Sequence, residues 1–222
     1  MKLTSEAKTL IGIGLATVVI LLSAVFFLSK TSPSTTSETV NESLPVDTTQ
    51  LIKADSYQTA SASAKVTIVE FLDYECEACG AAHPILKKVM SQYPNDINFV
   101  VRHFPNHFNS IAAGRAAEAA GLQGKYWEMH NTLFEKQTTW SEKRVPQNDK
   151  FKGFAVEIGL DMEKFNVDFE KGEFIEKINR DKKEGISLGV DATPTFFING
   201  VKAVGVLSEA EWKEKIDAEI NK

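Results

Sequence analysis

The sequence predicts an α/β domain that follows an N-terminal membrane segment. Three observations carry this prediction. Residues 10–28 are apolar and uncharged, which is typical of a membrane-spanning helix. Residues 66–104 show strand, helix and strand patterns in turn, and residues 195–222 show two further strands and a helix. Because residues 107–188 between them are helical in pattern, the order is β-α-β, a helical insertion, then β-β-α.

The composition places the chain among ordinary globular proteins. Of its 222 residues, 43% are hydrophobic and 25% are charged, which excludes a wholly disordered or collagen-like chain. Two cysteines are too few for a small scaffold held together by several disulfides. The formal net charge of −5 argues against general binding of nucleic acid, which requires a basic surface.

The apolar run Leu10–Leu28 contains 19 residues without a charge, close to the ~20 that span a bilayer as a helix. Lys2 and Lys8 precede it, which favours a cytoplasmic stub at residues 1–9 and export of the rest of the chain. A cleaved signal peptide is the alternative, but its apolar region is usually ~7–15 residues and ends at a small-x-small site, which Phe26–Lys30 does not resemble. We therefore expect a single-pass protein of the cell membrane with its folded domain outside the cytoplasm.

Residues 29–60 are rich in Ser and Thr and poor in large apolar side chains, so a flexible linker is predicted there. The folded domain is then expected over residues 61–222. Its first strand, Val66–Tyr74, is nearly continuously apolar, as in a central strand covered on both faces. A helix over Cys79–Gln92 and a strand over Ile97–Phe104 come next, and this spacing predicts a βαβ unit with parallel strands.

The helical insertion, residues 107–188, is expected to contain a loop at Thr138–Lys150. Gly159 is predicted to end one helix, and Asp161 is predicted to cap the next. Five phenylalanines in this region are predicted core residues because they recur at helical spacing: Phe151, Phe154, Phe165, Phe169 and Phe174.

Beyond the insertion, the strands Thr195–Asn199 and Val201–Gly205 flank the dipeptide Asn199-Gly200. That dipeptide predicts a β-hairpin because both residues tolerate positive φ. Residues 208–211, Ser-Glu-Ala-Glu, form a capping box that predicts the start of the last helix.

The chemistry of the chain centres on Cys76 and Cys79, its only cysteines, which lie three positions apart between the predicted strand and helix. The free N–H groups and partial positive charge of a helix start stabilise a thiolate. A cysteine pKa there falls from about 8.5 to ~3.5–7.5. The pattern therefore predicts Cys76 as the exposed nucleophile and Cys79 as the buried resolving thiol.

Two other uses of the cysteine pair stay open. A zinc site needs two further ligands, which His83, His103, His107 and His130 could supply. An inert structural disulfide also suits an exported protein. We expect no metal and no cofactor, with His83 on the helix surface and His103 and His107 in surface or loop packing.

Over about residues 61–222 the chain resembles the DsbA-like thiol–disulfide oxidoreductases of the thioredoxin superfamily. The string VTIVEFLDYECEACG matches the strand-CxxC-helix element, and Pro84 resembles the kink proline of the helix. Thr193-Pro194 before TFFING resembles the cis-proline loop, and residues 107–188 resemble the helical insertion. The resemblance implies a thioredoxin-like fold with a helical insertion, here preceded by a transmembrane helix.

The resemblance also implies roles for three further residues. It implies a cis bond before Pro194, a loop lying against the cysteine pair, and pairing of the Thr193 backbone with substrate. It implies that Glu70, inside the first strand, exchanges a proton with Cys79, and burial there would raise the pKa of Glu70. The alternatives are a partly exposed strand Glu and an ordinary proline at the start of a strand.

The residues around the pair differ from the strongest oxidase pattern. Glu77 and Ala78, which tune the pair, stand where many DsbA proteins carry a His. With Asp73 and Glu75 close by, negative charge raises the thiol pKa while the helix start lowers it, so the net direction is open from sequence.

The expected function is an extracytoplasmic thiol–disulfide oxidoreductase that introduces disulfides into exported proteins through its CEAC pair. Its expected partners are unfolded thiol-containing chains and a membrane quinone-linked reoxidase, DsbB-like or VKOR-like. One alternative is a membrane-anchored disulfide reductase or isomerase of the same fold, favoured by the acidic surroundings. Another is a binding or chaperone module that uses the pair structurally.

Overall fold

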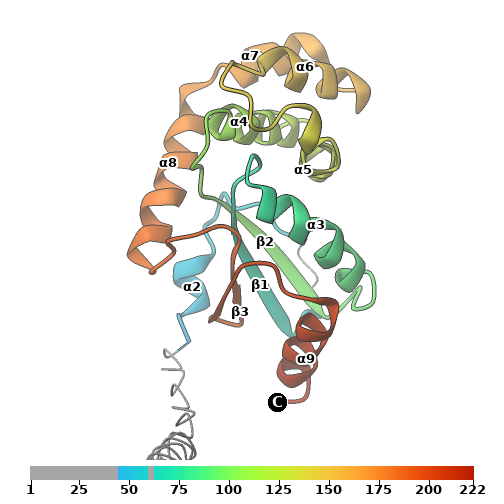
Figure 1. Cartoon of the computed structure of the whole chain (residues 1–222), viewed down its shortest axis with the longest axis vertical. Helices are drawn as coiled ribbons and strands as arrows, with labels where there is room; N and C mark the ends of the chain where they lie inside the picture. The colour runs from blue at the N-terminus through green and yellow to red at the C-terminus, as the bar shows by residue number, and fades with distance from the viewer. Residues whose placement is uncertain (1–44, 60–62) are drawn as a thin grey trace, which may run out of the picture. The chain divides into compact units, whose positions relative to one another are not determined.

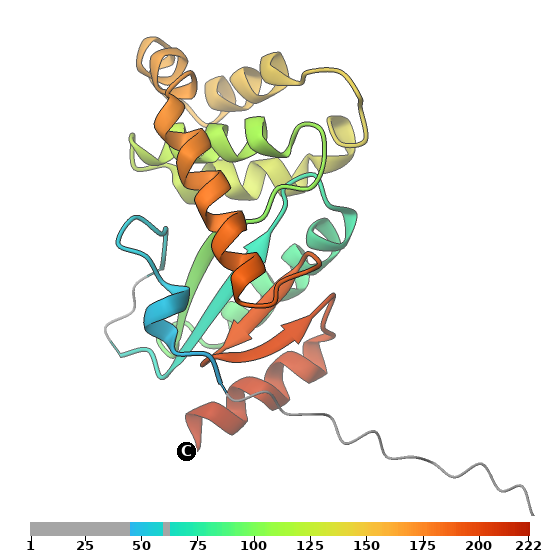
Figure 2. The ribbon, with the colours of Figure 1, turned by 90° about the vertical axis from the view of Figure 1, so that its left-hand side faces the viewer.

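The computed structural model describes residues 45–59 and 63–222. They form an α/β domain in which helices cover both faces of one sheet and cap one end of it (Figures 1 and 2). The elements in chain order are α2 (Thr48–Leu51), β1 (Val66–Leu72), α3 (Glu77–Met90), β2 (Ile97–His103), α4 (Ser110–Gly121), α5 (Tyr126–Glu135), the 3-10 helix η1 (Gln137–Thr139), α6 (Asn148–Glu157), α7 (Met162–Phe169), α8 (Gly172–Ser187), β3 (Thr195–Ile198), β4 (Val201–Val204) and α9 (Glu209–Ile220).

The sheet has the strand order β2-β1-β3-β4. Strands β1 and β2 are parallel and joined through α3, which confirms the predicted βαβ unit. Strand β3 pairs antiparallel with both β1 and β4. Asn199 and Gly200 have φ angles of 45° and 85° in the β3–β4 turn, so the predicted hairpin is confirmed.

The two faces of the sheet belong to two separate cores, because successive residues of β1 point to opposite sides. Ile68 belongs to the core that includes residues of α3 and α9, such as Val89 and Trp212. Val69 belongs to the smaller core that also contains Phe197. Strand β1 is buried along both faces, as the continuous apolar run predicted.

The helical insertion lies between β2 and β3, as predicted, and contains α4 to α8 with η1. Helices α4 to α7 form the cap at the end of the sheet where α3 begins (Figure 1). The expected loop at 138–150 is partly wrong, since η1 extends to Thr139 and α6 begins at Asn148. All five predicted core phenylalanines are buried, namely Phe151, Phe154, Phe165, Phe169 and Phe174.

Local signals for helix ends are confirmed at three places. Gly159, with φ of 71°, lies just after the end of α6. The Asp161 carboxylate accepts hydrogen bonds from two backbone N–H groups at the start of α7. Ser208 and Glu211 form the predicted capping box of α9.

The predicted linker 29–60 is wrong for its described part, residues 45–59, which we call the strap. Leu51 of the strap is fully buried in the core with Val69, and Val46 and Ile52 pack against that core partly buried. The backbone of the strap lies along β2, where Thr59 donates to Phe99 and Tyr57 accepts from Val101. Because β2 is an edge strand, the strap covers hydrogen-bonding groups that would otherwise stay open.

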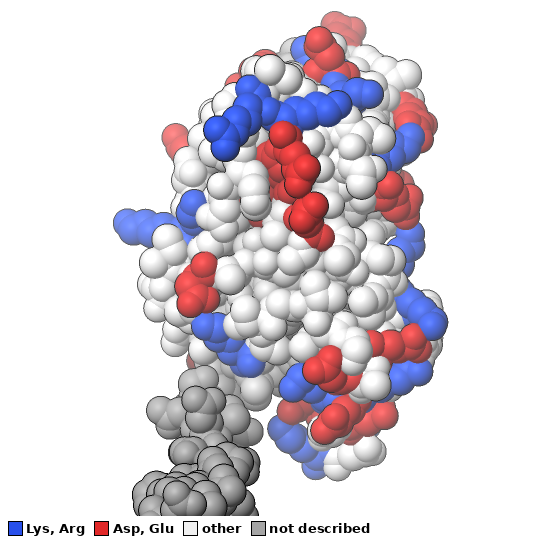
Figure 3. Space-filling view, viewed as in Figure 1, with Lys and Arg blue, Asp and Glu red and all other residues white. Residues whose placement is uncertain are grey.

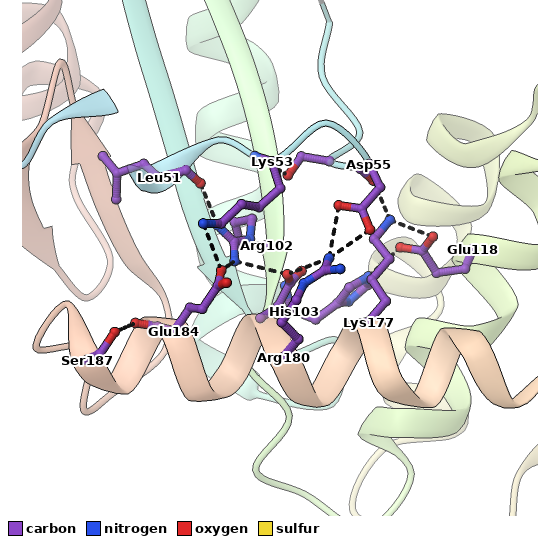
Figure 4. Close-up of polar contacts among 12 residues, drawn as sticks. Leu51, Lys53, Asp55, Arg102, His103, Glu118, Lys177, Arg180, Glu184 and Ser187 are labelled. Atoms are coloured by element: carbon purple, nitrogen blue, oxygen red, sulfur yellow. Dashed lines mark hydrogen bonds and ion pairs between the residues drawn. The ribbon is translucent and has the colours of Figure 1, made fainter. Parts of the chain in front are cut away.

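A hydrogen bond fastens the strap to β2, and an ion pair fastens it to α8 (Figure 4). Arg102, fully buried, donates to the Leu51 carbonyl oxygen at 2.6 Å and lies 3.0 Å from an Asp181 carboxylate oxygen. Arg180 pairs with Asp55 of the strap at 2.8 Å. The strap is thus part of the folded domain, whose start lies before residue 61.

The predicted membrane segment, residues 10–28, lies outside the described residues. Among the residues that are described, no helix has both the length and the apolar character needed to cross a bilayer.

Candidate functional site

The cysteine pair lies where the turn after β1 enters α3. Cys76 is the N-cap residue of α3, so the helix begins at Glu77, two positions earlier than predicted. Cys76 is half-buried and Cys79 is buried, and both are free thiols. Pro84 lies inside α3, not at its start. The pair therefore sits at the positive end of a 14-residue helix.

The two thiols differ sharply in acidity. A hydrogen bond from the Cys79 thiol is the main cause that lowers the pKa of Cys76, from the ordinary 9.0 to about 5. Burial opposes this, while hydrogen bonds with Thr193 and with the backbone N–H groups of Cys79 and Ala78 add to it. Burial is the main cause that raises the pKa of Cys79 well above 9.0, followed by its bond to Cys76 and the charge of Glu70. At neutral pH one thiolate is thus held at the half-exposed position.

The loop before β3 lies against Cys76, although it is 117 residues away in the chain. The Thr193–Pro194 peptide bond is cis. The Cys76 Sγ atom is 3.4 Å from the carbonyl oxygen of Thr193. The Pro194 carbonyl oxygen accepts a hydrogen bond from Gly205 at 2.9 Å, which ties the loop to the end of β4.

Glu70 lies in the middle of β1, with 4% of its surface exposed. Burial, and then the charge of Cys76, raise its pKa from 4.5 to about 8. Its charge in turn is one of the causes that raise the pKa of Cys79. Glu70 and the two thiols are therefore electrostatically coupled, with the carboxyl mostly protonated at neutral pH.

The carboxylates of the acidic residues before the cysteine pair accept hydrogen bonds from backbone N–H groups. The Asp73 carboxylate accepts hydrogen bonds from the N–H groups of Glu75 and Asn106. The Glu75 carboxylate accepts from the N–H groups of Asn109 and Glu142. These bonds fix the positions of the two carboxylates. The sequence left open whether the pKa of Cys76 is raised or lowered, and the hydrogen bonds from the Cys79 thiol and from the helix start lower it. The Glu77 side chain is exposed, and Ala78 acts through its backbone N–H.

The sequence analysis did not assign a role in the site to two residues, Gln137 and His107. Gln137 of η1 donates to the carbonyl oxygens of Tyr74 and Cys76, each at 2.8 Å. His107 Nδ1 lies 2.7 Å from an Asp73 carboxylate oxygen. Gln137 belongs to no sequence motif that could have identified it as a residue of the site. His107 was considered only as a packing residue or a zinc ligand.

The other histidines lie apart from the thiols. The expectation of surface or loop packing is wrong for His103, which is buried and lies 2.8 Å from a Glu118 carboxylate oxygen. His83 stacks on Phe134 and is half-buried, and burial is the main cause that lowers its pKa to about 4. Within the described ranges, no group of three or more His, Cys, Asp or Glu is placed to hold a metal ion.

Sequence comparison finds relatives that are much longer than this chain. It is 34% identical over 142 residues to a Na(+)/H(+) antiporter NhaA of Herminiimonas arsenicoxydans, covering 64% of this chain and 22% of the relative. It is 33% identical over 162 residues to the Na(+)/H(+) antiporter NhaA 1 of Mycolicibacterium vanbaalenii, covering 70% of this chain and 25% of the relative. The chain thus spans a quarter or less of these two relatives, whose name describes the whole proteins.

Solved structures share the fold of the domain. A thioredoxin-like oxidoreductase from Silicibacter pomeroyi has a TM-score of 0.69 and 27% identity, over 80% of this chain and 99% of that one. Wolbachia pipientis alpha-DsbA1 has a TM-score of 0.71 and 21% identity, over 77% and 94%. Oxidised BdbD from Bacillus subtilis has a TM-score of 0.66 and 24% identity, over 74% and 92%. The family described as Thioredoxin matches residues 58–218, and the chain therefore belongs to the thioredoxin family, with the fold of the DsbA-like thiol–disulfide oxidoreductases.

Proposed function

We propose that this protein is a membrane-anchored, extracytoplasmic thiol–disulfide oxidoreductase that introduces disulfides into exported proteins. The observation that carries the proposal is the contrast between the two thiols, with the pKa of Cys76 lowered to about 5 and that of Cys79 raised. Only the dithiol form holds a thiolate, so a low pKa at Cys76 stabilises the dithiol relative to the disulfide at neutral pH. A disulfide whose reduced form is stabilised in this way is an oxidant.

The proposed reaction is a two-step thiol–disulfide exchange. A substrate thiolate attacks Sγ of Cys76, the Cys76–Cys79 bond breaks, and Cys79 leaves with the electron pair. A second substrate thiolate then attacks the substrate sulfur of the mixed disulfide and releases Cys76 as a thiolate. The substrate loses two electrons to the pair. The low pKa of Cys76 suits it as the leaving group in this second step.

Glu70 is proposed to supply the proton that Cys79 needs. With a pKa raised to about 8 by burial and then by the charge of Cys76, its carboxyl is mostly protonated at neutral pH. Because the pKa of Cys79 lies well above 9.0, the thiolate formed when Cys79 leaves is a strong base. Transfer of a proton from Glu70 to Cys79 is therefore downhill, and reoxidation of the pair reverses it.

Thr193 and Pro194 are proposed to bind the substrate beside Cys76. The exposed valines Val204 and Val206 flank Gly205, whose N–H is bonded to the Pro194 carbonyl oxygen. Figure 3 shows acidic side chains near the start of α3 and few charged side chains below them, where the β3–β4 hairpin lies in Figure 1. An uncharged surface of this kind supports the proposal that the substrates are unfolded chains, which expose apolar side chains.

The remaining parts of the proposal concern the membrane. The apolar run at residues 10–28 would anchor the chain, and a DsbB-like or VKOR-like quinone-linked reoxidase would return the pair to the disulfide. An exported compartment suits this direction because disulfides persist there.

The test is the reduction potential of the pair in the full-length chain, measured by equilibration with glutathione, together with oxidation of a reduced unfolded substrate. A potential near −120 mV, with oxidation lost in Cys76→Ser, supports the proposal. A potential near −270 mV would instead identify a reductase fed by a membrane electron carrier. A pair that never exchanges with glutathione would leave a binding module as the function.

A further inference from the structure

We propose that His107 is a positioning residue for the Cys76 thiolate: an imidazolium, held by Asp73 in the turn that carries the cysteine, supplies the cation that residues 77 and 78 lack. This inference rests on the proposed function and adds to it a residue that sets the strength of the oxidant. It assigns a use to the acidic side chain of Asp73, which sequence alone presents as a repulsive charge.

The geometry places the imidazole, the carboxylate and the cysteine in one hydrogen-bonded cluster. His107 belongs to the loop between β2 and α4, and its Nδ1 lies 2.7 Å from Asp73 Oδ2. The Asp73 backbone carbonyl oxygen accepts a hydrogen bond of 3.1 Å from the Cys76 N–H. One residue therefore connects the histidine to the cysteine turn through its side chain and its backbone.

The Asp73 carboxylate is itself held rigidly, so the imidazole has a fixed partner. Its Oδ1 accepts from the N–H of Glu75 at 2.9 Å and from the hydroxyl of Ser110. Its Oδ2 accepts from the N–H of Asn106 at 2.6 Å as well as from His107. The carboxylate is thus fixed beside the imidazole, and a carboxylate partner favours the charged form of a histidine.

The charged groups that face His107 across this cluster and the adjoining cavity come from two segments of the chain. Asp73, Glu75 and Cys76 lie in the turn after β1. Glu142, Lys143 and Arg144 lie in the loop after η1, and with His107 and Glu75 they line an open cavity of about 690 Å³. Lys143 Nζ is bonded to the Thr139 carbonyl oxygen at 3.0 Å. Arg144 also lines this cavity, and it serves below as the control.

The titration behaviour of His107 agrees with this arrangement. Burial lowers its pKa, but the hydrogen bond and charge of Asp73, then the charges of Cys76 and Glu75, outweigh it and raise the pKa above 6.5. The interaction between two titrating groups is mutual. Since the Cys76 thiolate favours the imidazolium, the imidazolium must favour the thiolate by the same free energy.

The first measurement is the pKa of Cys76 in the reduced full-length chain, determined from the ultraviolet absorbance of the thiolate and from the rate of alkylation as functions of pH. His107→Gln should raise that pKa and should weaken the protein as an oxidant of glutathione by roughly two- to fivefold, the effect of a partly solvated ion pair. His107→Lys, which keeps the charge, should hold the Cys76 pKa near that of the unchanged chain. Arg144→Gln should shift it less than His107→Gln.

The second measurement tests the reciprocal effect. The pKa of His107, followed by NMR in the reduced chain, should fall when Cys76 is replaced by Ser. Equal Cys76 pKa values in His107→Gln and the unchanged chain would overturn the inference. A His107 pKa that is the same in Cys76→Ser and the unchanged chain would also overturn it. A Cys76 pKa that rises as much in His107→Lys as in His107→Gln would also overturn it, because the loss would then be structural.

Both measurements are made on the protein itself and need no exported substrate. If the chain fails to oxidise substrates but His107→Gln raises the Cys76 pKa, the proposed function fails and the inference stands. If oxidation is observed and the Cys76 pKa does not respond to His107, the function stands and the inference fails.

Discussion

The side-chain amide of Gln137 donates a 2.8 Å hydrogen bond to the carbonyl oxygen of Cys76, 61 residues away in the chain. The same nitrogen donates to the Tyr74 carbonyl oxygen at 2.8 Å. A Cβ atom at Gly80 would lie 2.1 Å from Gln137 Oε1, so the absence of a side chain there lets the amide approach α3. One side chain of the helical insertion thus fastens the reactive turn.

Gln137→Ala should destabilise the reduced protein by ~1–3 kcal/mol, because it removes both hydrogen bonds and leaves two backbone acceptors with fewer donors. Urea unfolding measures this change. Thr138→Ala, at the exposed neighbouring position, is the matched control and should cost far less. Equal losses in the two variants would mean that the bonds from Gln137 contribute little.

Patterns that act over a few residues were readable from the sequence. The apolar run of β1, the Asn199-Gly200 turn and the capping box at Ser208 each depend on local backbone preference, and each was predicted. The position of Cys76 at a helix start is local in the same sense, because strand and helix patterns meet there.

Contacts between distant segments were not readable in this way. Leu51 and Ile52 stand together in an otherwise mostly polar stretch, and only the sheet shows that Leu51 is fully buried. The carboxylates of Asp73 and Glu75 look repulsive beside the cysteines until their donors, 33 to 67 residues further along, are in place. Contacts of this kind depend on how the fold brings distant segments together, so the spacing of apolar residues along the sequence does not predict them.

The difference in acidity between the two thiols predicts selective alkylation. In the reduced chain at neutral pH, iodoacetamide should modify Cys76 and spare Cys79, and the rate at Cys76 should rise with a midpoint near pH 5. Mass spectrometry of peptides identifies the modified residue. In Cys76→Ser the remaining Cys79 should stay unmodified under the same conditions. Similar labelling of both residues, or a midpoint near 9, would contradict the assigned asymmetry.

The raised pKa of Glu70 predicts that the free energy of unfolding falls as pH rises. Its folded-state pKa of about 8, raised first by burial, lies above the ordinary 4.5, so folding is not penalised below about pH 4.5, where both states are protonated. Between about 4.5 and 8 the unfolded chain ionises and the folded one does not, which costs up to ~1.4 kcal/mol per pH unit.

Glu70→Gln should remove this dependence, so its stability relative to the unchanged chain should increase by several kcal/mol from about pH 5 to pH 8. Denaturant unfolding of the reduced proteins at intervals of pH provides the comparison. The exposed Glu214→Gln variant should behave like the unchanged chain. Parallel stability curves for Glu70→Gln and the unchanged chain would show that the buried carboxyl does not titrate in this range.

The strap predicts that the stable domain begins near residue 45 and not near residue 61. Leu51 is fully buried against Val69 and its neighbours, so Leu51→Ala should cost ~2–5 kcal/mol in urea unfolding, as for other large buried side chains. Gln50→Ala changes the adjacent exposed residue and should cost almost nothing. A flexible linker would make the two substitutions equivalent, because neither side chain would then lose packing. A large effect confined to Leu51 would instead require that the strap unfolds together with the sheet that it covers.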